Sequence, residues 1–192
     1  MIRLACLLAL LLTITSCSSG PKEREFELDY KVINASQKVE PVWLEDIKKY
    51  EGDSGYHYFL SQSENRNRRL CIKSATARST AVIAAEVSQE ISNDYTEVTS
   101  LDNDSEEVKT FYEKLTQTVR TKVSGVRVKE QYWEKRQKKS GEELTGSPYY
   151  ACFSVVGIKE ETLDRAKKAA QESAIVLAPS DKKEELREKF ED

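Results

Sequence analysis

The chain has 192 residues, of which 30 are Lys or Arg and 33 are Asp or Glu, and its formal net charge is −3. Its hydrophobic share of 39% is sufficient for one modest globular domain. The slight negative charge excludes a general electrostatic attraction to nucleic acid, which requires a basic surface. We therefore expect no nucleic-acid partner.

The N-terminus carries a short apolar run, LACLLALLLTIT, over residues 4–15, with Arg3 in front of it. The run is too short to cross a bilayer as a permanent helix, which takes about 20 residues. It has the length and the basic flank of a cleavable secretory signal. We expect this signal to occupy residues 1–16.

Cys17 directly follows Ile14, Thr15 and Ser16, and this pattern resembles the lipobox of bacterial lipoproteins. The resemblance implies that Cys17 is lipidated with fatty-acyl chains and becomes the first residue of the mature chain. Two or three acyl chains make a lasting membrane anchor. Ser18, in place of an aspartate, implies sorting to the outer membrane, and we favour its periplasmic side over the cell surface. The alternative is an ordinary secretory signal in which Cys17 has no role.

Two further cysteines, Cys71 and Cys152, remain in the folded part. The chain has no C-x-x-C spacing, and its single histidine, His57, could not complete a zinc site. In an oxidising compartment this pair favours a structural disulfide, and two buried free thiols are the alternative.

Residues 17–40 allow two interpretations. The segment is charged, which is typical of a tether, yet EREFELDYKVI alternates apolar and polar residues as a half-buried strand does. A lipidated tether and an additional edge strand both remain open.

The domain proper is expected over residues 41–178. A short amphipathic segment, 41–50, precedes a first strand at 55–64, in which His57 has the position of a structural residue. The spacing of apolar residues then predicts one long helix over 70–100, with Ala77, Ala81 and Ala85 forming a ridge of small side chains, and a second helix that ends near Gly125.

Two strands, 125–137 and 148–158, follow, and the ten polar residues 138–147 are expected to form a long loop between them. A third helix is predicted over 161–177, and the charged tail 179–192 is compatible with a fourth, solvated helix. The order predicts an α+β fold in two layers, with a small antiparallel sheet of three or four strands packed on two to three helices.

Several of these stretches together resemble the Lpp-twenty family of outer-membrane lipoproteins, which includes a flagellar lipoprotein. They are PVWLED, the helix segment SATARSTAVIAAEVSQEIS, YWEK and YYACFSV, in order over residues 41–175. The resemblance implies a compact domain held at the outer membrane, and some relatives assemble into rings around the flagellar motor. It implies no catalytic residue.

The chain shows no G-x-S-x-G nucleophile motif, no phosphate-binding loop and no dinucleotide fingerprint. We therefore expect a protein that is not an enzyme and that needs no cofactor and no metal.

Two features are candidate partner contacts. Arg66, Arg68 and Arg69 lie at the start of the long helix, where the helix dipole disfavours positive charge unless an anion lies opposite. The alternative is a solvated loop that pairs with nearby glutamates. Trp133 and its neighbour Tyr132 point to opposite faces of one strand, so that one of them either anchors a partner or is covered by a terminal segment.

The leading hypothesis is a lipoprotein with a domain for protein interaction, through self-association or with other envelope proteins. The alternative is a small-ligand carrier or sensor with a pocket between helices and sheet.

Overall fold

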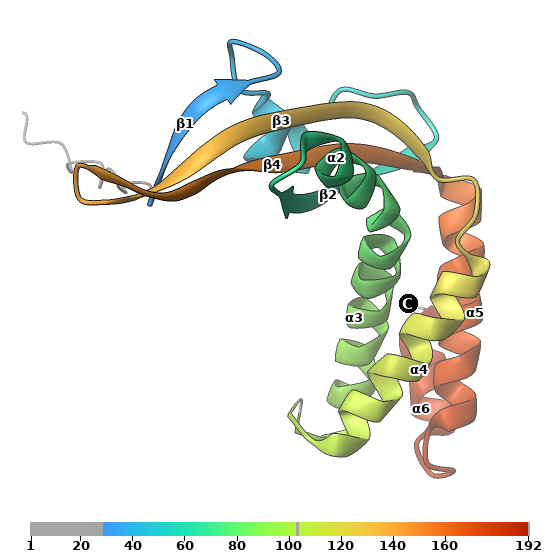
Figure 1. The fold of residues 1–192 in the computed structure, drawn as a ribbon. Helices are drawn as coiled ribbons and strands as arrows, with labels where there is room; N and C mark the ends of the chain where they lie inside the picture. The colour runs from blue at the N-terminus through green and yellow to red at the C-terminus, as the bar shows by residue number, and fades with distance from the viewer. Residues whose placement is uncertain (1–28, 103, 192) are drawn as a thin grey trace, which may run out of the picture.

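The computed structural model describes residues 29–102 and 104–191, so the predicted signal, Cys17 and most of the tether lie outside the described residues. The described chain has an α+β fold, as predicted (Figure 1). Its sheet has four antiparallel strands in the order β1-β3-β4-β2. The strands are β1 (Tyr30–Ala35), β2 (Tyr56–Asn65), β3 (Arg127–Ser140) and β4 (Glu143–Lys159).

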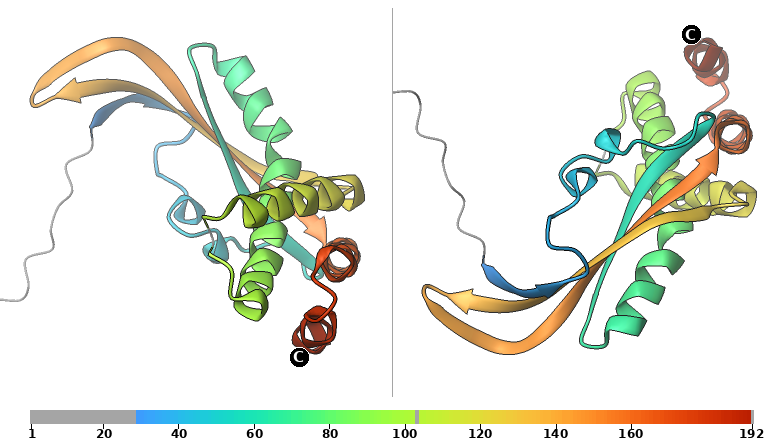
Figure 2. Two further views of the ribbon diagram at one scale, coloured as in Figure 1. Left: turned by 90° about the horizontal axis from the view of Figure 1, so that it is seen from below. Right: turned by 90° about the horizontal axis from the view of Figure 1, so that it is seen from above.

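The α-helices lie on one side of this sheet. Figure 1 shows α2 beneath the middle of the sheet and the other helices hanging from one end of it, whereas β1 and the turn between β3 and β4 extend past the helices at the other end. The helices are α2 (Arg68–Ala77), α3 (Ser79–Thr99), α4 (Glu106–Lys122), α5 (Glu160–Leu177) and α6 (Lys183–Glu191). Figure 2 shows the arch of the β3–β4 hairpin from below and from above.

The single long helix predicted over 70–100 is wrong, because the chain forms two helices with a break at Arg78. The backbone of Arg78 has φ −76° and ψ −14°, away from the helical ψ near −42°. The hydroxyl of Ser79 donates to the carbonyl of Thr76 at 2.7 Å, a local bond that competes with the helical pattern. The break lets α2 pack on the sheet while α3 turns into the helical core.

The predicted ten-residue loop between the last two strands is also wrong. β3 and β4 continue to Ser140 and Glu143, which pair with each other, so that only Gly141 and Glu142 form the turn. Gly141 has φ 59°, at the first of the two turn positions, where a type II′ hairpin turn favours glycine. The result is a long two-stranded arm.

The main core lies between the helices and one end of the sheet. The predicted stripes of α4 and α5 are buried, and Phe59, Val156 and Ile158 extend the core onto β2 and β4. The tail forms the fourth helix that its sequence allowed, but this helix is not fully solvated, because Leu186 of α6 is buried in the same core. α6 is therefore part of the domain. The stripe residues are Val108, Phe111, Leu115 and Val119 in α4 and Leu163, Ala166, Ala170 and Ala174 in α5.

The strand interpretation of the N-terminal segment holds from Tyr30 onward, since β1 pairs with β3 and belongs to the sheet. After β1 come two short 3-10 helices, Val42–Leu44 and Ile47–Lys49. Trp43 is buried there against Tyr132 and Val155, so that this segment covers part of the sheet face that lies opposite the helices.

Candidate functional site

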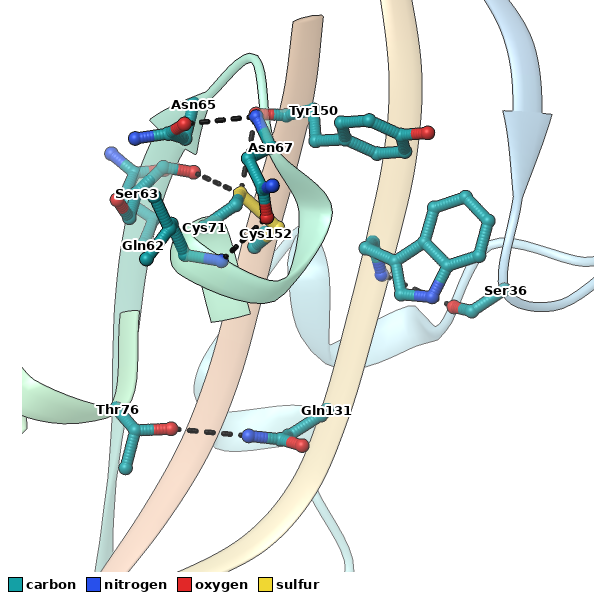
Figure 3. Close-up of a disulfide and its surroundings, with 12 residues drawn as sticks. Ser36, Gln62, Ser63, Asn65, Asn67, Cys71, Thr76, Gln131, Tyr150 and Cys152 are labelled. Carbon is teal, nitrogen blue, oxygen red and sulfur yellow. Dashed lines mark hydrogen bonds between the residues drawn. A yellow bond between two sulfur atoms is a disulfide. The ribbon is translucent and has the colours of Figure 1, made fainter. Parts of the chain in front are cut away.

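The predicted disulfide is present (Figure 3). Sγ of Cys71 in α2 is bonded to Sγ of Cys152 in β4, and both residues are buried. The carbonyl oxygens of Ser63 and Tyr150 lie 3.4 and 3.2 Å from Sγ of Cys71. The bond fastens α2 to the middle of the sheet, so its role is structural.

The predicted arginine cluster lies at the N-terminus of α2. Arg66, Arg68 and Arg69 are exposed, and the first turn of α2 contains no acidic residue. Asn67 caps the helix by accepting a hydrogen bond from the backbone N–H of Leu70 at 3.1 Å. Within the described residues, none of the three arginines forms an ion pair, so the pairing with glutamates that the alternative interpretation included is not found there.

Trp133 lies on the same face of the sheet as α2 and is partly buried. Its ring meets Tyr150 edge-on at 5.7 Å, and the guanidinium of Arg68 lies 5.0 Å from the ring centroid. Tyr132 points to the opposite face, where Trp43 covers it. The described chain therefore covers part of both faces of β3 at this point, and the role of Trp133 as a partner contact remains a prediction.

His57 has the environment of a surface side chain. Its Nε2 lies 3.7 Å from Glu160 Oε1, and both side chains are at least half exposed. In residues 29–102 and 104–191, no group of three His, Cys, Asp or Glu side chains could hold a metal ion.

The most unusual polar arrangement lies on the face opposite the helices, along β3. Glu134 is only 4% exposed. Its Oε1 accepts a 3.0 Å hydrogen bond from the Tyr132 hydroxyl, and its Oε2 accepts a 2.6 Å hydrogen bond from Nε of Arg136. A buried carboxylate is costly unless it is paired and hydrogen-bonded, and this one has both partners.

Aromatic rings hold Arg136 in place. Its guanidinium carbon lies 4.0 Å from the ring centroid of Tyr30 in β1 and 5.5 Å from that of Phe153 in β4. Burial raises the pKa of the Tyr132 phenol well above its ordinary value, and the hydrogen bond to Glu134 adds to this effect. Burial also raises the pKa of Tyr30, although the nearby Arg136 opposes the increase. Both phenols are therefore neutral at physiological pH.

Arg136 also borders a cavity of about 340 Å³. The floor of this cavity is made by Ala151 and Phe153 of β4, and one wall is made by residues 62–64 of β2. Arg78 reaches it from the junction of α2 and α3 and donates a long hydrogen bond of 3.4 Å to the carbonyl of Gln62. The guanidinium groups of Arg78 and Arg136, which are far apart in the sequence, therefore border the same cavity.

The sequence patterns do not point to this site. Glu134 and Arg136 lie in the charged stretch EKRQKK, which is typical of a solvated surface. The available signal was the alternation of side chains along a strand, which places Tyr132, Glu134 and Arg136 on one face of β3. Arg78 gave no such signal, because its position depends on the unpredicted break between α2 and α3.

The site offers hydrogen-bond donors, aromatic surface and one exposed carboxylate, Glu64, but no nucleophile paired with a base. These groups can exchange hydrogen bonds with a bound molecule and cover an apolar part of it. Comparisons with known proteins add no assignment, because no family model, no curated protein and no solved structure matches the chain. Among the helices of the described residues, none has the length and apolar character to cross a membrane.

Proposed function

We propose that this chain is a lipoprotein of the bacterial outer membrane, anchored through lipidated Cys17, whose domain binds protein partners without catalysing a reaction. The pattern ahead of Cys17 and the resemblance to the Lpp-twenty family support the anchor and an envelope or flagellar setting. The observation that carries the binding role is the edge strand β1 on the arm that projects past the helices (Figure 1).

The outer edge of β1 offers backbone groups for strand addition. The backbone N–H of Lys139 donates to the carbonyl of Asp29 at 2.9 Å, so these two residues form a hydrogen-bonded pair. The neighbouring pair, Tyr30 and Lys138, is then of the kind without hydrogen bonds between its members. Antiparallel pairs alternate, so the N–H and C=O groups of Tyr30 and the N–H of Val32 point away from β3; the register shifts only after Val32, before Asn34. Within the described residues no strand pairs with this edge, and such edges are templates for another chain.

Side chains and position support the same conclusion. Val32 and Ile33 are 40% and 47% exposed, an apolar pair on a strand whose outer side is open. Because β1 begins thirteen residues after Cys17, it lies within about 45 Å of the anchor even along a fully extended chain. An anchored copy therefore presents its edge close to the membrane, where neighbouring copies are concentrated, and we propose a second copy as the partner.

Cross-linking of the lipidated protein in intact cells tests this role, with light scattering of the detergent-purified protein as the second measurement. Val32→Pro removes an N–H that points outward, so the ladder to β3 is kept while strand addition is blocked. Ile33→Lys places a charge on the same edge. Both variants are expected to lose oligomers at least tenfold.

The matched control is Val176→Lys, at an exposed apolar position of α5. Like the β1 variants, it replaces an exposed apolar residue, but in a helix far from β1 in the sequence. The protein with this change is expected to form oligomers as the unchanged protein does. Oligomers that persist in both edge variants, or that disappear equally in the control, would contradict the proposed edge.

A further inference from the structure

The cavity beside Arg136 has balanced charges. Arg136 is matched by the buried carboxylate of Glu134, to which it donates at 2.6 Å. The remaining charged groups of the lining are Arg78 and Glu64, one of each sign, and both are exposed. The lining thus has no net charge, and it presents hydrogen-bond donors for an anionic group and an acceptor for a cationic group.

Arg136 is a preorganised donor. Its Nε is committed to Glu134, and its side chain is only 15% exposed between the rings of Tyr30 and Phe153. Among the described residues, its two terminal amino groups donate no hydrogen bond to the protein. A guanidinium that is already held in place loses little side-chain entropy when it binds a carboxylate.

The floor of the cavity is apolar. Phe153 contributes aromatic surface. The small side chain of Ala151 leaves room for a ligand, because its partners in the sheet, Glu64 on β2 and Glu134 on β3, are larger. A volume of about 340 Å³ is at the lower end of the range for ligand sites. It accommodates a molecule of the size of an amino acid or a dipeptide.

We propose that this cavity binds a small zwitterion of the amino-acid or dipeptide type. Its carboxylate accepts hydrogen bonds from Arg136 and Arg78, its ammonium group lies toward Glu64, and its apolar part covers Phe153 and Ala151. This inference goes beyond the proposed partner binding, because the cavity and the β1 edge are different surfaces and each can fail without the other.

Calorimetric titration of the full mature protein in detergent tests the proposal with three probes. Alanyl-alanine carries both charges, its C-terminal amide lacks the carboxylate, and its N-acetyl derivative lacks the ammonium group. We expect saturable binding of alanyl-alanine and affinities at least tenfold weaker for the other two, since a hydrogen bond to a charged group is worth about a factor of ten or more.

Variants assign the contacts. Arg78→Gln is expected to weaken alanyl-alanine about tenfold and to leave the amide unchanged, whereas Glu64→Gln is expected to weaken alanyl-alanine and to leave the N-acetyl derivative unchanged. Arg69→Gln, an exposed arginine outside the lining, is the matched control and is expected to change nothing. Ala151→Val fills the floor without removing a charge and is expected to weaken binding of every probe, and a melting curve shows that each variant is folded.

The proposal is overturned if alanyl-alanine shows no saturable binding up to about 10 mM, a weak affinity for even a small ligand. It is also overturned if Arg69→Gln weakens binding as much as Arg78→Gln does, or if folded Ala151→Val binds as the unchanged protein does.

Discussion

Nε of Arg136 donates a 2.6 Å hydrogen bond to Oε2 of Glu134, and both side chains are largely buried on the sheet face opposite the helices. The pair connects three strands, because Arg136 also packs on Tyr30 of β1 and on Phe153 of β4. The attachment of β1 and the shape of the cavity therefore depend on the same guanidinium.

Arg136→Met is expected to lower the free energy of unfolding by about 3–5 kcal/mol, because it leaves the carboxylate of Glu134 buried without its charge partner. The double variant Arg136→Met with Glu134→Leu removes both charges and is expected to recover most of the loss. Urea denaturation of the unchanged protein, the two single variants Arg136→Met and Glu134→Leu, and the double variant provides the double-mutant cycle. A double variant as unstable as the sum of the two single changes would show that the pair is not coupled.

The disulfide is expected to stabilise the fold substantially, because Cys71 and Cys152 are 81 residues apart and their bond restricts the unfolded chain. Replacing both residues with alanine is expected to lower the free energy of unfolding by about 2–5 kcal/mol. Thermal melting measures the change. Unchanged melting after removal of the bond would refute a stabilising role.

Ser100 ends α3 with φ 56° and ψ 28°, a left-handed conformation that disfavours any side chain. Ser100→Gly is therefore expected to raise the free energy of unfolding by roughly 0.5–1 kcal/mol, since glycine is the preferred residue at this position after a helix. Ser100→Ala keeps the strain and is the control. Equal melting temperatures for the two variants would contradict this explanation.

Asp53 is expected to titrate below its ordinary range, because the Nζ of Lys129, 2.6 Å away, donates to its carboxylate and lowers its pKa. A lowered folded-state pKa means that the pair stabilises the fold above the ordinary range of an aspartate and that this contribution is lost as the pH falls through the lowered value. Carboxyl NMR during an acid titration measures the pKa. In Lys129→Met it is expected to rise to the ordinary value, and an unchanged pKa in that variant would exclude Lys129 as the cause.

Much of the fold was predictable wherever one face of an element is buried. Val108 and Phe111 in α4, like Ala166 and Ala170 in α5, recur at helical spacing because they pack into one core. The alternation of Tyr58 and Phe59 in β2 likewise places the two rings on opposite faces of the sheet.

The predictions were wrong where burial leaves no periodic pattern of apolar residues in the sequence. Leu144 and its neighbours at the tip of the hairpin are exposed on both faces, so no apolar alternation distinguishes these strands from a loop. The break at Arg78 contains neither proline nor glycine and depends on the packing of Cys71 and Ala75 against the sheet. The cavity could not be predicted for the same reason, because tertiary structure alone brings Arg78 near Arg136.

Lipidation of Cys17 is tested most directly by mass spectrometry of the N-terminal peptide from the mature protein, purified from the membranes of its native host. We predict a chain that begins at Cys17 and carries acyl groups, and a Cys17→Ser variant that keeps its signal and leaves the membrane fraction. A mature protein without acyl mass, recovered in the aqueous fraction, would contradict the anchor and the assembly that depends on it.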